Sequence, residues 1–117
     1  NWTDVVGYVK TTYNKEFLIM ETAQLFRTGG NDAHVDILGV ENIPAGYVNP
    51  PTTNTQKKYM RDFGQELYDA GGIGIIYWGG EWVSFKGNQA TNGSTFENQA
   101  FYDFSNKALP VLQAFTN

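Results

Sequence analysis

The stretch EFLIMETAQLF, residues 16–26, runs four apolar residues, 17–20, into a carboxylate at Glu21. A continuous apolar run, as opposed to strict alternation, is typical of a parallel strand that is covered on both faces. The stretch IGIIYW, residues 73–78, repeats this pattern with β-branched and aromatic residues and ends at Trp78. The sequence therefore predicts two buried parallel strands, each ending at a residue of distinctive chemistry.

Helical patterns lie before, between and after these strands. Apolar residues at helical spacing predict an amphipathic helix over residues 3–13. A second helix is expected to begin at Thr52 or Thr55 and to end at the glycine pair 71–72. A short last helix is expected to begin near Pro110, since proline suits the first helical position.

Long polar segments, residues 24–54 and 79–98, follow the two strands. Loops of this length are commonly functional, and parallel α/β proteins build their sites after the carboxyl ends of strands. Helix and strand alternation indicates a parallel α/β fold with right-handed crossovers. Two such strands cannot cover themselves, so we expect the chain to hold roughly a quarter to a third of a (β/α)8 TIM barrel of about 250 residues.

The composition is that of a packed globular protein, with 41% hydrophobic residues. Its 8 basic and 12 acidic residues give a net charge of −4, which makes nucleic acid and anionic membranes poor partners. No apolar run reaches the length of about 18 residues that a membrane-spanning helix needs. The absence of cysteine excludes disulfides and zinc-thiolate sites.

A carboxylate beside an aromatic ring suits sugar chemistry. The acid can act at the anomeric carbon while an indole face packs on the C–H face of the sugar ring. Glu21 and Trp78 are candidates for these two roles, with Trp82 as a further platform. From spacing alone a structural interpretation stays open: Glu21 could pair with Arg27 or cap a loop, and both tryptophans could belong to the core.

Three motifs resemble a known family: LIMETA at 18–23, GIGIIYWGGEW at 72–82 and GSTFENQAFYDFSNKALPVL at 93–112. They are similar to the closing third of the glycoside hydrolase family 53 endo-β-1,4-galactanases. The resemblance covers nearly the whole chain, and its third motif is long and specific. It implies that residues 1–117 are the C-terminal segment of one catalytic TIM barrel, with about its seventh and eighth strands and the flanking helices.

The resemblance implies retaining hydrolysis of β-1,4-galactan, the side chain of pectin found in type I arabinogalactan. Glu21 matches the family nucleophile, and Trp78 matches the platform under the sugar at the point of bond breaking. The second carboxyl, the acid/base, has no counterpart here, so the remainder of the barrel is an expected partner. The sequence departs from the family pattern at YWGGEW, residues 77–82, where many members have glutamate and proline after the tryptophan; Glu81 therefore inherits no role.

Two other classes of function stay open at this point. The chain could belong to another retaining barrel glycosidase that cuts mannan or xylan. It could also be a non-catalytic carbohydrate-binding domain, although such a domain predicts mostly alternating strands. A polymeric substrate implies an extracytoplasmic protein, secreted or at the cell surface.

The loop NDAHVDI, residues 31–37, has acids or histidine at every second position, and an extended loop would point them the same way. Bacterial members that this chain resembles bind calcium with such a run, completed by a serine and an acid from the last loop. The resemblance implies five ligands here: Asp32, His34, Asp36, Ser94 and Glu97. Gly30 stands where the family has its first acid, and the alternative is a solvated acidic loop. Calcium would tie the two long loops together.

Overall fold

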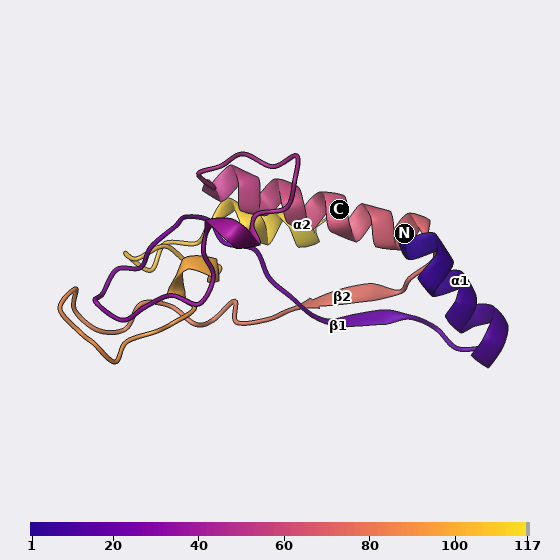
Figure 1. The fold of residues 1–117 in the computed structure, drawn as a ribbon, viewed down its shortest axis with the longest axis horizontal. Helices are drawn as coiled ribbons and strands as arrows, with labels where there is room; N and C mark the ends of the chain where they lie inside the picture. Colours follow the sequence, from indigo (N-terminus) through magenta and orange to yellow (C-terminus); the bar gives the residue numbers. More distant parts are fainter. Residues whose placement is uncertain (117) are drawn as a thin grey trace.

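The computed structural model describes residues 1–116 and has the α/β alternation that the sequence predicts (Figure 1). Its helices and strands, in chain order, are α1 (Trp2–Tyr13), β1 (Leu18–Thr22), α2 (Thr53–Asp69) and β2 (Gly74–Tyr77). Three short 3-10 helices are added by the loops and the C-terminal segment: η1 (Val40–Asn42), η2 (Glu97–Gln99) and η3 (Pro110–Phe115). The molecule is elongated, 52 Å by 26 Å by 24 Å, because two long loops extend from one end of the strands.

Side-chain caps define where the helices begin. The Asn1 side chain accepts a hydrogen bond of 2.9 Å from the Thr3 backbone, so α1 begins one residue earlier than expected. The Thr52 hydroxyl accepts one of 3.1 Å from Thr55, which confirms the first of the two predicted starts of α2. The segment after Pro110 is helical as expected, but its hydrogen bonding is that of a 3-10 helix.

The two strands pair in parallel, with three partners in register: Leu18 with Gly74, Ile19 with Ile75 and Thr22 with Tyr77. Between the last two pairs, Met20 and Glu21 of β1 lie opposite a single residue of β2, Ile76. This extra residue is a β-bulge. Bulges bend a strand and change the direction of its side chains, and they are common beside active sites.

One face of the strand pair lies on the hydrophobic core. The buried core cluster is Phe26, Met60, Leu109 and Val111, and Ile75 and Tyr77 of β2 pack against it. Because side chains alternate along a strand, Ile76 and Trp78 face the other way. On that open face Met20 is 62% exposed and Ile76 is 46% exposed.

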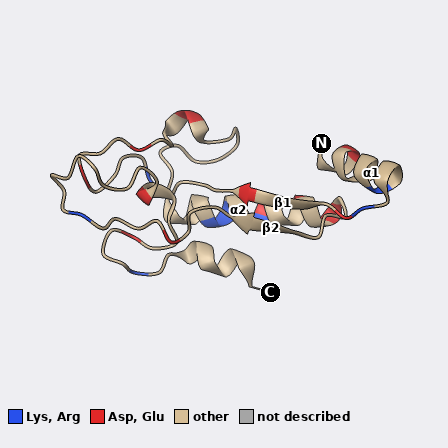
Figure 2. Cartoon of the chain, turned by 90° about the horizontal axis from the view of Figure 1, so that it is seen from below, with Lys and Arg blue, Asp and Glu red and all other residues tan. Residues whose placement is uncertain are grey.

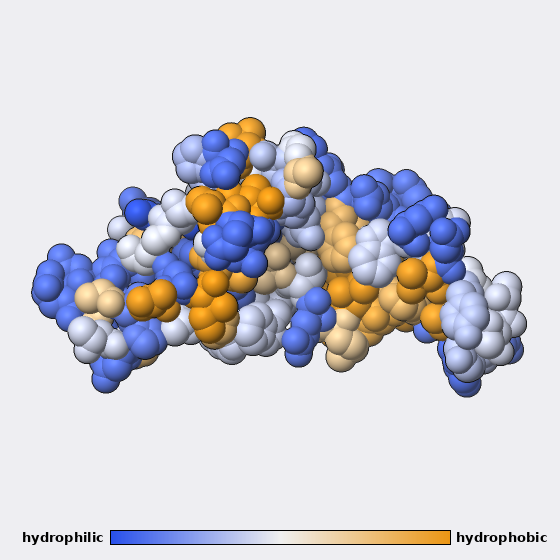
Figure 3. All heavy atoms as spheres, viewed as in Figure 1, coloured by the Kyte–Doolittle hydropathy of each residue, from blue (hydrophilic) through white to orange (hydrophobic). Residues whose placement is uncertain are grey.

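The open second face agrees with the expectation that two such strands cannot cover themselves. Within residues 1–116, α2 is the one α-helix that contacts a strand, and it covers one face only. Figure 2 shows β1 and β2 from the side away from α2. Figure 3 shows apolar residues on the surface below α2, where the strands lie in Figure 1.

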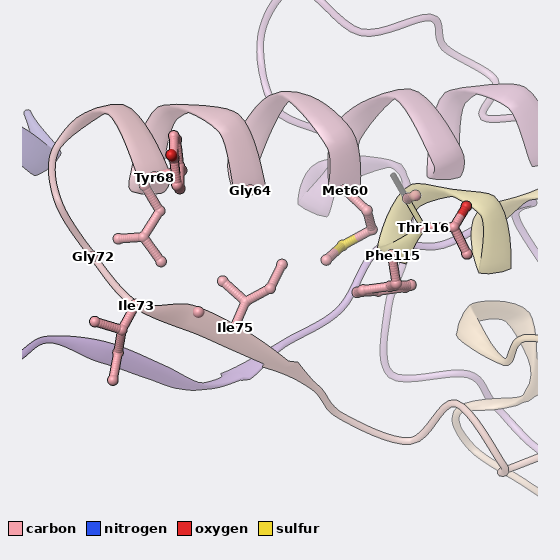
Figure 4. Close-up of a pocket in the computed structure, with 11 residues that line it drawn as sticks. Met60, Gly64, Tyr68, Gly72, Ile73, Ile75, Phe115 and Thr116 are labelled. Atoms are coloured by element: carbon pink, nitrogen blue, oxygen red, sulfur yellow. The ribbon is translucent and has the colours of Figure 1, made fainter.

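The free edge of β2 also borders an apolar groove. A hollow of about 410 Å³ lies between α2, β2 and η3, with Leu67, Ile75 and Phe115 among its lining (Figure 4). A strand that has a neighbour on one side only exposes unpaired backbone groups along the other edge. No helix within residues 1–116 combines the length and apolar character needed to cross a bilayer.

Candidate active site

The bulge in β1 turns Glu21 to the open face of the strand pair. Strict alternation from Ile19, which lies opposite the core-facing Ile75, would place Glu21 under α2. The extra residue instead sets Met20 and Glu21 together opposite Ile76, and both are exposed. An acidic residue marks this carboxyl end of β1 in Figure 2.

The Glu21 side chain makes no hydrogen bond and no ion pair with residues 1–116. The interpretation of Glu21 as a partner of Arg27 is therefore wrong, since the Arg27 guanidinium lies 4.9 Å from the centre of the Phe104 ring. A carboxylate that is exposed and unpaired at the end of a strand is free to meet a substrate.

Trp78 lies at the same end and on the same face. Its backbone N–H donates a hydrogen bond of 2.9 Å to the carbonyl of Thr22, the residue that follows Glu21. The parallel pairing thus continues one residue beyond β2 and holds the indole next to the acid-bearing strand end. The structure places Glu21 and Trp78, the two residues that the sequence analysis proposed for sugar chemistry, at the same end of adjoining strands.

Trp78 belongs to a cluster of three aromatic rings. Its ring centre lies 4.6 Å from that of Trp82 and 4.9 Å from that of Phe96, both at steep angles. Trp82 and Phe96 also touch each other, with centres 4.9 Å apart. The two contacts of Trp78 are edge-to-face, and such contacts fix ring orientation. Trp78 stays 37% exposed, whereas Trp82 is partly buried, so Trp82 supports Trp78 as well as adding surface.

Sequence reasoning missed Phe96 and a set of buried polar groups behind Trp78. We call this set the amide cluster: Gln24, Gln56, Tyr77 and Gln99. The Tyr77 hydroxyl donates to the backbone carbonyl of Gln99 at 2.6 Å, and burial raises the pKa of Tyr77. Glutamines in a helix and in polar loops usually predict exposure, so the pattern gave no signal for this cluster.

Three carboxylates gather between the two long loops. Asp36 and Glu97 meet at Gly30, where an added Cβ would lie 2.5 Å from Glu97 Oε1 and 3.0 Å from Asp36 Oδ2. Asp32 lies against the backbone of Gly93. Burial and the charges of Glu97 and Asp32 raise the pKa of Asp36 to about 6.

These carboxylates have too few donors, since the backbones of His34 and Asn31 donate only to Asp32 Oδ1 and Glu97 Oε1. Four of their oxygens are buried without a hydrogen-bond partner: Asp32 Oδ2, Asp36 Oδ1 and Oδ2, and Glu97 Oε2. Buried polar atoms are normally satisfied, so orphaned ones mark an incomplete site. Even so, no three acidic or histidine side chains within residues 1–116 are grouped closely enough to hold a metal ion as they stand.

The loop that carries them is not extended, contrary to the expectation from spacing. The His34 backbone donates a hydrogen bond of 2.7 Å to Asp32 Oδ1, which folds the chain into a tight turn. His34 Nδ1 lies 2.7 Å from the carbonyl of Thr91; because a carbonyl can only accept, this nitrogen carries the proton. The Ser94 hydroxyl donates to the carbonyl of Trp82 at 3.4 Å, so the segment that follows Gly93, the neighbour of Asp32, is tied to the aromatic cluster.

Known proteins resemble this chain over nearly its whole length. An arabinogalactan endo-beta-1,4-galactanase of Cellvibrio japonicus (strain Ueda107) is 31% identical over 115 residues, which are 96% of this chain and 30% of that protein. A solved structure, the Ignisphaera aggregans GH53 catalytic domain, superposes with a TM-score of 0.82 at 31% identity, covering 97% of this chain and 33% of that one. The chain thus spans about a third of the length of each relative.

The likeness to a GH53 catalytic domain implies that these α/β elements are part of a TIM barrel. That agrees with a parallel strand pair whose second face and free edge lie open. The sequence model of the family described as glycosyl hydrolase family 53 matches residues 1–115, and it confirms the resemblance of the three motifs. This chain belongs to glycosyl hydrolase family 53.

Proposed function

We propose that this chain is the C-terminal part of a retaining endo-β-1,4-galactanase and supplies the nucleophile half of its active site. The observation that carries the proposal is the placement of Glu21 and Trp78 on one face, at the carboxyl ends of adjoining parallel strands. Barrel enzymes place their reacting groups at that end. The named activity of the Cellvibrio japonicus relative supports galactan as the substrate.

Glu21 would act as the nucleophile. Its carboxylate oxygen bonds to the anomeric carbon as the glycosidic C–O bond breaks, and the departing oxygen takes a proton from a second carboxyl. Water then attacks the galactosyl ester, gives its proton to that second carboxyl and frees Glu21. In retaining enzymes the two carboxyl groups lie about 5 Å apart, and the exposed side of Glu21 leaves room for the second.

Trp78 would form the floor under the sugar at the cleavage point. Galactose has an apolar C–H face that an indole ring can cover. The steep contacts with Trp82 and Phe96 hold that ring while leaving part of it exposed. The glycines after Trp78 stand where the family has a glutamate and proline, so we expect this subsite to be shaped differently.

The remainder of the barrel would be the second partner. The open face of Met20 and Ile76 corresponds to the interior of a barrel, and the groove beside β2 accepts the next strand and helix. In this assignment β1 and β2 are strands seven and eight. The acid/base then comes from the rest of the barrel, and residues 1–117 alone are inactive.

We also propose a structural calcium site between the two long loops. Asp32, Asp36 and Glu97 offer buried oxygens that have no donor, which is the chemistry a hard cation prefers. Ser94 and His34 would complete the set: the His34 backbone donates to Asp32, and Ser94 follows Gly93, against which Asp32 lies. The side chains are not grouped as ligands as they stand, so they would have to close on the ion, which would then brace both loops.

The substrate class sets the location that we propose. Galactan side chains of pectin are polymers outside the cell, so an endo-acting enzyme has to work beyond the cytoplasm. An extracytoplasmic location, secreted or at the cell surface, follows from this.

The test is hydrolysis by the full-length protein that contains this chain. Reducing sugar release is measured on β-1,4-galactan, β-mannan and β-xylan, and the anomeric form of the first product is read by NMR. We expect short β-anomeric galacto-oligosaccharides. Cleavage of mannan or xylan in preference would show another retaining glycosidase, and binding of galactan without cleavage would show a carbohydrate-binding domain.

A further inference from the structure

Gln99 is a fully buried amide directly behind the aromatic cluster. It lies at the end of η2 with no exposed surface, and its Nε2 donates a hydrogen bond of 2.8 Å to the backbone carbonyl of Trp78. The backbone N–H of Gln99 donates to the carbonyl of Phe96 at 3.1 Å. One residue thus contacts the backbones of two of the three clustered aromatic residues.

The direction of the Gln99 amide is fixed by its partner. A carbonyl oxygen can only accept, so the group that faces Trp78 must be the NH₂ of Gln99. The backbone carbonyl of Gln99 is fixed in turn, because it accepts from the Tyr77 hydroxyl at 2.6 Å and from Gln56 Nε2 at 3.1 Å. The Gln99 side chain, which donates to Trp78, is therefore attached to a backbone that is itself held by hydrogen bonds.

Gly79 makes the approach of Gln99 to Trp78 geometrically feasible. Its φ of +76° is in the left-handed region, and an added Cβ would lie 2.9 Å from both Gln99 Nε2 and Trp82 Cε3. A side chain at position 79 would have to displace both the Gln99 amide and the Trp82 indole. The turn after Trp78 is thus built to admit Gln99.

The same segment also holds the loop that follows Glu21. The backbone N–H of Phe26 donates to the carbonyl of Asn98 at 2.8 Å, and that of Phe101 donates to the carbonyl of Gly80 at 2.8 Å. Tyr77 joins the two sides, since its hydroxyl lies 3.0 Å from the Gln24 carbonyl and 2.6 Å from that of Gln99. The hydrogen bonds of residues 98–101 thus join the loop that follows β1 to the loop that follows β2.

We propose that Gln99 is a positioning residue for substrate binding: through the Trp78 carbonyl it sets the orientation of the Trp78 ring at the sugar. The inference rests on the proposed function, in which Trp78 is the floor of the cleavage subsite. Gln99 does not touch substrate. Its effect is on how well the sugar is held, and the nucleophile is left unchanged.

The experiment compares Gln99→Met with Asn98→Leu in the full-length protein. Asn98 is an equally buried amide of the same turn, but its Nδ2 donates to the carbonyl of Leu38 at 2.9 Å and leaves Trp78 alone. Both substitutions keep side-chain length and remove the amide that donates to a backbone carbonyl. We expect Gln99→Met to raise KM for galacto-oligosaccharides about tenfold with little change in kcat, as loss of one buried hydrogen bond would. Asn98→Leu should leave KM unchanged.

Circular dichroism gives a second readout that does not need activity. Trp78 and Trp82 are close enough, at 4.6 Å, for their indole transitions to couple. We expect the coupled signal to weaken in Gln99→Met and to persist in Asn98→Leu. Equal signals in all three proteins, or an equal rise of KM in both variants, would overturn the proposal.

Gln99→Glu keeps the test decisive if the methionine variant fails to fold. A protonated carboxyl can donate to the Trp78 carbonyl and an ionised one cannot, so KM should rise with pH as the new acid ionises. A KM that follows the unsubstituted protein at every pH would count against the proposal. Failure of the proposed function is distinguishable, because it would appear as absent galactan cleavage in the unsubstituted protein, with the circular dichroism comparison still valid.

Discussion

The backbone N–H of Trp78 lies 2.9 Å from the carbonyl oxygen of Thr22 and donates a hydrogen bond to it. This bond is the last of the parallel pairing, and it joins the residue after Glu21 to the candidate sugar platform. Acid and indole are consequently held by neighbouring backbones, with no loop between them that could vary their spacing. The predictions below follow from that arrangement and concern the full-length protein unless stated otherwise.

Replacing Glu21 by glutamine should lower kcat on galactan by about 10⁴-fold or more, because the amide cannot form the covalent intermediate. Glu16→Gln is the matched control: it is an exposed acid just before the amino end of β1, away from the site. We expect it to keep wild-type activity. Glu21→Ala should regain turnover with azide and yield the α-galactosyl azide; full activity in Glu21→Gln would refute the nucleophile assignment.

Replacing Trp78 by alanine should raise KM by about tenfold or more, since a stacked ring contributes on the order of 1.4 kcal/mol to binding. Trp82→Phe keeps an aromatic partner for Phe96 and should raise KM less. The measurement is steady-state kinetics on galacto-oligosaccharides, supported by fluorescence titration of the Glu21→Gln protein. Unaltered affinity in Trp78→Ala would show that the ring belongs to the fold alone.

The sequence predicted those parts of the fold that depend on periodicity. The continuous apolar runs gave both strands, and the Thr52 cap gave the start of α2. The bulge at Met20 and Glu21 could not be predicted, because it is a property of pairing between strands and leaves no mark in either one. The continuous apolar runs also pointed to burial on both faces, and the second face, which is open in this chain, is the one that two strands alone were expected to leave uncovered.

The sequence predicted only those residues of the candidate site whose side-chain type itself indicates a chemical role. Glu21 and Trp78 were found because each ends a strand. Gln56 and Gln99 were not, because glutamine in a helix or a loop normally faces water, and only the meeting of three segments buries these two. Glu97 was found through family resemblance, and its contact with Gly30 became visible in three dimensions.

Calcium should reverse the effect of removing Asp36. In the presence of a chelator Asp36→Ala should unfold at a higher temperature than wild type, because an unpartnered carboxylate among like charges is lost. With calcium at about 100 times its Kd the wild type should gain about 2.7 kcal/mol of stability and the variant much less. Differential scanning calorimetry measures both.

Asp103→Ala serves as the control for this comparison. Asp103 accepts hydrogen bonds from the backbones of Ser105 and Lys107 in an exposed turn, so its loss should cost the same stability with calcium as with chelator. A calcium-dependent gain that is equal in wild type and Asp36→Ala would contradict the site. No gain in wild type would mean that calcium is not bound there.

The open strand face should make residues 1–117, expressed alone, self-associate. Replacing Ile76 by lysine should increase the monomer fraction of this piece, because it charges an apolar surface that lacks a cover. Val35→Lys is the control, since Val35 is 80% exposed but lies on a loop away from the strands. Sedimentation velocity gives the monomer fraction; equal monomer fractions for the two variants would argue against the strand face as the contact.

Ile76→Lys should have the opposite effect in the full-length protein. There the same face would be the packed interior of the barrel, and a buried unpaired charge destabilises strongly. Thermal unfolding should show a large loss of stability for Ile76→Lys and little change for Val35→Lys. A full-length Ile76→Lys protein as stable as wild type would show that the face is not interior.

The bulge in β1 makes strand length a stricter requirement than residue identity. Removing Met20 would restore even pairing with β2, because Glu21 would then lie opposite Ile76 by itself. The bend that sets the direction of the acid would be lost, although every remaining side chain could stay the same. Laboratory evolution that samples deletions should therefore find none tolerated between Ile19 and Thr22, while substitutions of Met20 by other apolar residues persist. In this strand the number of residues matters to the direction of the acid as much as the identity of the residues does.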